Sequence, residues 1–99
     1  MTVVAEDASG IVGFAAVQTT AEQDAVRAEE LTMLYVLARA HGSGVGQSLL
    51  DTVLAERPAS LWVAADNPRA HAFYRRNRFA PDGATSSFGP ISATVRLVR

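Results

Sequence analysis

Residues 31–54 read LTMLYVLARAHGSGVGQSLLDTVL, an apolar stretch followed by a glycine-rich turn and then by an amphipathic segment. The apolar stretch is typical of a buried strand, and the apolar spacing after the turn predicts a helix from Gly44 to Glu56. Gly42, Gly44 and Gly46 leave backbone N–H groups of the turn unscreened by side chains. Because the first N–H groups of a helix lack internal partners and lie at the positive end of its dipole, this junction predicts a binding site for an anion such as a diphosphate.

The spacing of the glycines argues against two common nucleotide folds. A P-loop ends in Gly-Lys-Ser/Thr, whereas this chain contains no lysine and reads Gly46-Gln47-Ser48 at that point. A dinucleotide-binding fingerprint needs G-x-G-x-x-G, but the glycines here fall as G-x-G-x-G. The turn therefore belongs to neither pattern.

Size and composition restrict the class of protein. With 99 residues, 48% of them hydrophobic and 19% charged, the chain is expected to form a single globular domain over residues 1–99. A net charge of −1 gives no electrostatic reason to expect nucleic acid or an anionic membrane as a partner. The absence of cysteine excludes disulfides, thiolate metal sites and a cysteine nucleophile. With no long apolar run and no basic leader, a soluble cytoplasmic protein is expected, and the exclusive use of arginine as a base hints at a GC-rich bacterium.

The pattern before the glycine-rich turn predicts three strands. Residues 2–6 and 11–19 are β-rich and flank the turn DASG, which predicts a hairpin. Residues 20–25, TAEQDA, form a polar turn, and residues 28–37 form the third strand. Its second half, LTMLYVL, is apolar on both faces, which favours a central strand covered on both sides.

The pattern after the turn predicts a βαβ unit, a second helix and a closing hairpin. Residues 60–66 form a short buried strand, parallel to the third strand. Asn67-Pro68 is a favourable helix start, and Ala70, Phe73 and Tyr74 share one face of that helix. The chain from Phe79 closes as a hairpin whose better strand is 91–98. The expected fold is thus α+β, with a mixed, mostly antiparallel sheet, a central parallel βαβ unit and two helices.

Two segments together resemble the GNAT superfamily of N-acetyltransferases. LYVLARAHGSGVGQSLLD, residues 34–51, resembles the family's acyl-CoA pyrophosphate loop, Gln/Arg-x-x-Gly-x-Gly/Ala between a strand and a helix. DNPRAHAFYRRNRF, residues 66–79, resembles its Asn-x-x-Ala-x-x-Phe-Tyr segment. The resemblance extends from Val3 to Val98 and implies an N-terminally shortened form of the fold. The family's first strand and the one or two helices after it would lie before Met1.

The resemblance implies acetyl-CoA as a cosubstrate and no metal. In the family the central strand splays from the next one and its backbone groups bind the pantetheine amides, and Leu34, Tyr35 and Val36 occupy that stretch. Asn67 would cap the second helix and contact the pantetheine arm. The loop residues that would hold the diphosphate are His41, Gly42, Ser43, Gly44, Val45, Gly46 and Gln47.

This loop also departs from the family pattern. His41 and Ser43 stand where the family carries Gln or Arg and frequently Arg, which predicts weaker, pH-dependent coenzyme binding. The alternative interpretation of the loop is a simple strand-to-helix turn.

The resemblance also implies two catalytic residues. Glu30 lies on the central strand where relatives carry a carboxylate general base, and the alternative is an ordinary charged residue at a strand start. Tyr74 occupies the position of the general acid that protonates the leaving thiolate, and its phenol is neutral at pH 7; the alternative is a core aromatic residue. His71, without a partner at metal-ligand spacing, is interpreted as a solvated helix residue. Arg78 replaces the glycine usual after this helix, where a left-handed conformation would cost about 1 kcal/mol.

The function implied is transfer of an acetyl group from acetyl-CoA to a primary amine by direct attack in a ternary complex. The acceptor would be a small-molecule amine or a protein amino group, with no nucleic-acid or membrane partner. The elements absent before Met1 usually wall the acceptor site, so a truncated chain, a homodimer that completes the site, and a lost catalytic role all remain open. The alternative function is a catalytically inactive CoA-binding, structural or dimerisation module.

Overall fold

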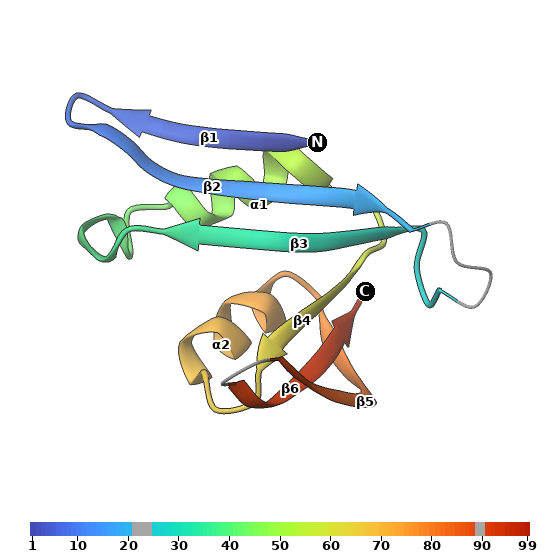
Figure 1. Ribbon diagram of the computed structural model, residues 1–99. Helices are drawn as coiled ribbons and strands as arrows, with labels where there is room; N and C mark the ends of the chain where they lie inside the picture. The colour runs from blue at the N-terminus through green and yellow to red at the C-terminus, as the bar shows by residue number, and fades with distance from the viewer. Residues whose placement is uncertain (21–24, 89–90) are drawn as a thin grey trace.

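The computed structural model describes residues 1–20, 25–88 and 91–99. Six strands, two α-helices and one short 3-10 helix follow one another along this part of the chain (Figure 1). They are β1 Thr2–Asp7, β2 Gly10–Thr19, β3 Glu29–Val36, η1 Ala38–Ala40, α1 Val45–Leu54, β4 Ser60–Ala64, α2 Pro68–Arg76, β5 Ala80–Phe88 and β6 Ile91–Val98.

The strands form one mixed sheet in the order β1-β2-β3-β4-β6-β5. All neighbours are antiparallel except β3 and β4, which are parallel and are joined through α1. This arrangement confirms the predicted fold class, both hairpins and the central βαβ unit. The polar turn predicted over residues 20–25 lies largely outside the described residues.

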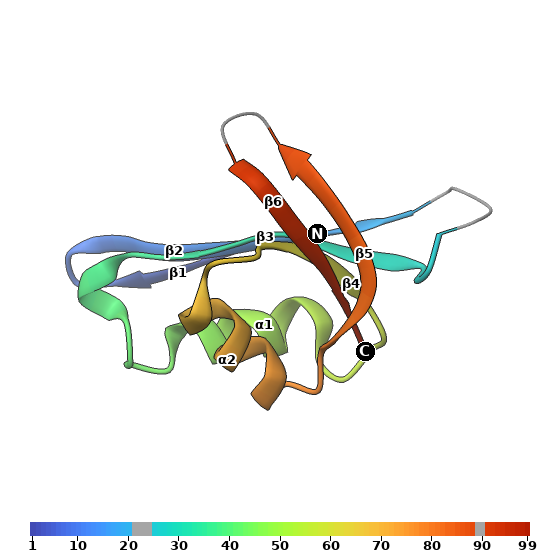
Figure 2. The same cartoon turned by 90° about the horizontal axis from the view of Figure 1, so that it is seen from below.

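The core lies between the sheet and the helices. The apolar stripe of α1 is buried at Leu49, Leu50, Val53 and Leu54, as its spacing predicts. Figure 2 shows both helices on the same side of β1, β2 and β3.

Coverage of β3 on both faces, predicted from its continuous apolar run, is wrong. Side chains alternate across a strand, and Leu34 and Val36 pack against the core on the helix side. Met33 and Tyr35 point to the opposite face, where they are 50% and 53% exposed because no described element covers them. An apolar run alone does not show whether a second layer is present.

Element boundaries differ from the predictions by one or two residues. Helix α1 is shorter at both ends than the predicted 44–56, because Gly44 is its N-cap and Ala55 leaves the helix with φ 51°. Strand β3 is one residue shorter at each end than predicted, and β4 ends at Ala64 instead of Asp66. Within the described ranges, no helix is long and apolar enough to cross a membrane.

Helix α2 begins where its sequence predicts, but the burial of its residue His71 differs from the prediction. The Asn67 side chain accepts a hydrogen bond from the Ala70 N–H at 3.1 Å, and Pro68 occupies the first turn. Arg78, just after the helix, has φ 70°, the left-handed conformation predicted for it. His71 is not solvated as predicted: it is half-buried, and its Nε2 lies 3.0 Å from the Ala64 carbonyl oxygen.

Candidate active site

The sheet opens between β3 and β4. Glu30 and Ser60 are the only residues of the described chain that pair across these two strands, whereas β4 stays paired with β6 as far as Ala64. A β-bulge in β3 leaves Thr32 as an extra residue opposite β2, and its hydroxyl donates to the Ala16 carbonyl at 3.2 Å. Bulges bend a strand and increase its twist. Beyond Glu30, the edge of β3 that faces β4 therefore carries backbone groups with no ladder partner.

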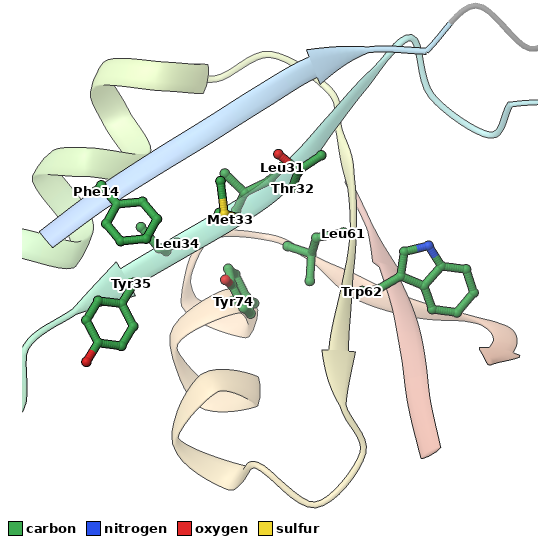
Figure 3. A pocket seen from close by; sticks show the side chains of 9 residues that line it. All are labelled: Phe14, Leu31, Thr32, Met33, Leu34, Tyr35, Leu61, Trp62 and Tyr74. Carbon is green, nitrogen blue, oxygen red and sulfur yellow. The ribbon is translucent and has the colours of Figure 1, made fainter. Parts of the chain in front are cut away.

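A pocket of about 370 Å³ lies at this opening (Figure 3). Leu61 points from β4 toward β3, Tyr74 lies between the two strands, and Trp62 points away from β3. None of the side chains that line the pocket carries a charge at neutral pH. They are Phe14, Leu31, Thr32, Met33, Leu34, Tyr35, Leu61, Trp62 and Tyr74.

Tyr74 brings a buried phenol from α2 into this pocket. The residue is 9% exposed, and its ring packs edge-on against Phe73 and Phe79, with ring centroids 5.3 and 5.7 Å away. Its hydroxyl makes no hydrogen bond within the described residues. Burial raises the pKa of Tyr74 to about 12, because the phenolate would lose its hydration there. The phenol is therefore neutral at pH 7 and has a hydrogen to donate.

The glycine-rich loop presents a helix end without a side-chain cap. Gly42 and Gly44 have φ of 79° and 90°, and a Cβ added at either position would meet no atom within 4 Å. Gly44 is the N-cap of α1, and no side chain caps this end. Gly46 lies in the first turn, where an added Cβ would be 3.7 Å from the Val36 side chain and from the Phe73 ring. The loop is open outward and packed closely against β3 and α2 on its inner side.

Two side chains of this loop bond within the protein. The backbone N–H of His41 donates to the Ala38 carbonyl at 3.1 Å, and the ring Nε2 of His41 lies 3.0 Å from the Val36 carbonyl oxygen. Ser43 directs both its N–H and its hydroxyl to the Ala40 carbonyl. Backbone N–H groups are left without a protein acceptor in the described part of the chain at Gly42, Gly44, Val45, Gly46 and Gln47. These amides, at the positive end of α1, fit an anion.

The structure brings some of the predicted site residues together and leaves others apart. Leu34, Tyr35 and Tyr74 line one pocket. Glu30 is half-buried where β3 and β4 still pair, and it does not line the pocket; Asn67 does not line it either. The preceding carboxylate, Glu29, bonds to Arg57 at 2.7 and 3.2 Å. Glu30 makes no such pair in the described residues.

Two features of the site were missed by sequence reasoning. The bulge at Thr32 leaves no mark in a run of apolar residues, so its position was not predicted, whereas the divergence of β3 from β4 was expected from the family resemblance. Asn77 bonds to the side chain of Gln47, 30 residues earlier, and no local pattern indicates such a pair. Gln47 was predicted to help hold a diphosphate. Its side chain bonds to Asn77, so only its backbone N–H is left for that role.

Metal ligands do not gather in the part of the chain that the structure describes: no three His, Asp or Glu side chains lie close enough to hold an ion.

Comparison with known structures shows the same fold in longer proteins. Arabidopsis thaliana Naa50, in complex with the bisubstrate analogue CoA-Ac-MVNAL, has a TM-score of 0.82 at 22% identity, over 99% of this chain and 71% of that one. PH1933 from Pyrococcus horikoshii OT3 has a TM-score of 0.79 at 25% identity, over 97% of this chain and 62% of that one. Ribosomal-protein-alanine N-acetyltransferase from Brucella melitensis has a TM-score of 0.78 at 24% identity, over 99% and 67%. The chain thus spans less than two thirds of the Pyrococcus protein.

A comparison with curated proteins finds no match. A family model described as "Acetyltransferase (GNAT) domain" matches residues 1–81. That range includes β3 and β4, the glycine-rich loop, and α2 with Tyr74. The chain therefore belongs to the GNAT acetyltransferase family.

Proposed function

We propose that this protein is an acetyl-CoA-dependent N-acetyltransferase that acts on a primary amine by direct attack in a ternary complex. The observation that carries the proposal is the opening between β3 and β4, which holds the Tyr74 phenol next to unpaired backbone of β3. The anion-binding end of α1 lies beside it, linked to the C-cap of α2 by the hydrogen bonds between the Gln47 and Asn77 side chains. A ligand with a diphosphate, amide groups and a thioester fits these three features.

The coenzyme would be held chiefly by backbone groups. The unpartnered amides from Gly42 to Gln47 would bind the diphosphate, because no cationic side chain of the loop is available for it. Leu34 and Tyr35 would bond the pantetheine amides through the free edge of β3, as added strands do. The Val36 carbonyl is already in contact with the His41 ring, so Val36 would contribute less. Asn67 would contribute only the part of its side chain that the helix cap leaves free.

Acetyl-CoA supplies an activated acetyl group: the amine nitrogen bonds to the acetyl carbon as the carbon–sulfur bond breaks, which yields an amide and a free thiol. Tyr74 would donate a proton to the departing sulfur and regain one from solvent. Since a desolvated thiolate is also more basic than one in water, the raised pKa of Tyr74 is compatible with this transfer. Glu30, which lies outside the pocket lining, would accept the amine proton through an ordered water.

The acceptor would be a small-molecule amine or a protein amino group. The Brucella relative named above is a ribosomal-protein-alanine N-acetyltransferase, which favours including peptides with free N-termini among the amines to be tested. The decisive experiment is release of free thiol from acetyl-CoA across a panel of amines, with calorimetry of CoA binding alongside. Amine-dependent thiol release supports the proposal, and a folded sample that gives no binding heat at millimolar CoA contradicts it.

A second candidate, an interaction module, is favoured by the open sheet face. Three apolar side chains are half exposed on the face of β1, β2 and β3 that the helices do not cover: Val4, Met33 and Tyr35. An apolar face of this kind is typical of a contact surface. A second copy seated there would bring an additional wall to the pocket at Tyr35. Gel filtration with and without CoA tests it: a dimer independent of CoA supports a module of this kind, and a monomer contradicts it.

A further inference from the structure

The side chains of Gln47 and Asn77 form a closed pair of amides. Gln47 Nε2 donates to Asn77 Oδ1 at 2.8 Å, and Asn77 Nδ2 donates back to Gln47 Oε1 at 3.0 Å. The second N–H of Gln47 bonds to Asp51 Oδ1 at 2.9 Å, and that of Asn77 bonds to the Phe73 carbonyl at 3.0 Å. Turning either amide over would place donor against donor and acceptor against acceptor. The orientation of both amides is therefore fixed.

This pair joins the two helices of the candidate site at specific turns. Gln47 is the third residue of α1, and its N–H belongs to the unpartnered amides of the anion-binding end. Asn77 is the C-cap of α2, and its N–H donates to the carbonyl of Tyr74 at 3.0 Å. The pair thus connects the turn that would hold a diphosphate to the turn that carries the phenol.

Arg99 also links the two helices, because it donates to the carbonyls of Ala55 and Asn77 at 2.8 and 3.1 Å, but it meets α1 at the opposite end from the anion-binding turn. Within the described chain, no other hydrogen bond links a side chain of α1 to a side chain of α2 or its cap. The ring of Phe73 lies near the first turn of α1, where a Cβ added at Gly46 would be 3.7 Å from it, and an apolar neighbour of this kind sets no direction. At the anion-binding end of α1, the register of the two helices is therefore set by the directional bonds of Gln47 and Asn77.

We propose that Gln47 and Asn77 are positioning residues that fix the distance from the diphosphate-binding end of α1 to the hydroxyl of Tyr74. This inference depends on the proposed function. One coenzyme molecule must meet both ends at once, and a misplacement of about 1 Å at a reacting centre can cost about 10²-fold in rate. Without the pair, each end keeps its own ligand groups but the spacing between them is no longer set.

The test compares a ligand that reaches one end with a ligand that reaches both. ADP carries the diphosphate alone, whereas CoA also carries the pantetheine arm and the thiol. For Asn77→Ala, we expect ADP affinity within about twofold of the parent protein and a fall of about tenfold or more in thiol release at saturating acetyl-CoA. The double variant Gln47→Asn/Asn77→Gln exchanges the two amide lengths and should recover most of the rate. Turnover within twofold of the parent protein for Asn77→Ala, or equal losses of ADP affinity and turnover, would overturn the proposal.

Two further samples keep the test independent of folding and of the proposed function. Asp51→Ala removes a neighbour of Gln47 but leaves the pair intact, so a loss as large as that of Asn77→Ala would also count against the proposal. Asn77→Asp, which keeps the side-chain size but lacks the N–H donors, replaces the alanine variant if that variant does not fold. If the parent protein binds CoA but transfers no acetyl group to any amine, the proposed function fails. Calorimetry then decides the positioning role: Asn77→Ala should weaken CoA binding severalfold and ADP binding less than twofold, and equal changes refute it.

Discussion

Glu30 and Ser60 pair at the point where β3 and β4 begin to diverge. Within the described residues, these two strands pair with each other nowhere else. Beyond this point the two strands separate, and the opening between them is lined by uncharged side chains. Glu30 is thus the carboxylate at the closed end of the opening. This is the position from which the general-base role proposed for Glu30 would have to act, without direct contact with the acetyl group.

Replacement of Glu30 by glutamine should lower turnover at pH 7 by about 10²-fold, because the acceptor ammonium loses its proton acceptor. The loss should shrink at pH 9, since more of the amine is then neutral without help. Glu29→Gln is the matched control, because Glu29 is the adjacent carboxylate but bonds to Arg57. Thiol release at both pH values measures the effect. Equal losses at the two pH values, or equal losses in the two variants, would contradict the role.

Tyr74→Phe should lower turnover by about 10²- to 10⁴-fold and leave CoA affinity nearly unchanged. The thermal midpoint should stay nearly equal, because the hydroxyl makes no hydrogen bond in the described structure whose loss would lower stability. Since the pKa of Tyr74 is raised to about 12, the phenol stays protonated across the working range. The pH–rate profile of the parent protein should therefore show no alkaline decline from this group below about pH 11. A variant with full turnover, or a decline near pH 10, would remove the assignment.

The conformation of Gly44 allows a prediction that separates stability from binding. Gly44→Ala forces a Cβ into a left-handed backbone, at a cost of about 1 kcal/mol in the free energy of unfolding. Gly10 also has positive φ, 117°, with open space around it, but it is the first residue of β2, at the end of the β1–β2 turn. Both alanine variants should lose similar stability, measured by denaturant unfolding. Only Gly44→Ala should weaken CoA binding, by about tenfold. A similar loss of CoA affinity in Gly10→Ala would contradict the assignment of the anion site to the loop.

Local sequence signals predicted the elements correctly because their causes are local. The apolar stripe of α1 and the Asn67-Pro68 start of α2 involve residues a few positions apart, so their physical basis is visible in the sequence. The left-handed conformation of Arg78 was instead expected from the family resemblance, because Arg78 stands where the family usually carries glycine. The positions of Leu34, Tyr35 and Tyr74 around one pocket followed from two motifs and their order.

Features that depend on distant residues were not predictable. Arg99, the last residue of the chain, donates to the carbonyls of Ala55, Arg57 and Asn77 and stacks over the Phe79 ring at 4.8 Å. It therefore joins the ends of both helices, although its own surroundings in the sequence show only an exposed strand end. The uncovered side of β3 is a similar case, because the sequence pattern of an apolar strand is the same whether or not another layer covers that face.

Arg78 provides a stability test away from the pocket. Its φ of 70° is costly for any residue with a Cβ, and its nearest charged partner, Glu56, lies 4.0 Å away with both side chains largely exposed, so that ion pair contributes little. Arg78→Gly should therefore raise the free energy of unfolding by about 0.5–1 kcal/mol, the relief of left-handed strain less the added freedom of the unfolded chain. Arg76→Gly is the control: Arg76 is the last residue of α2 and does not have a positive φ, so glycine there relieves no left-handed strain and should lower stability. Denaturant unfolding of the two variants should give shifts of opposite sign. Destabilisation of both would mean that the Arg78 side chain contributes contacts that outweigh its backbone strain.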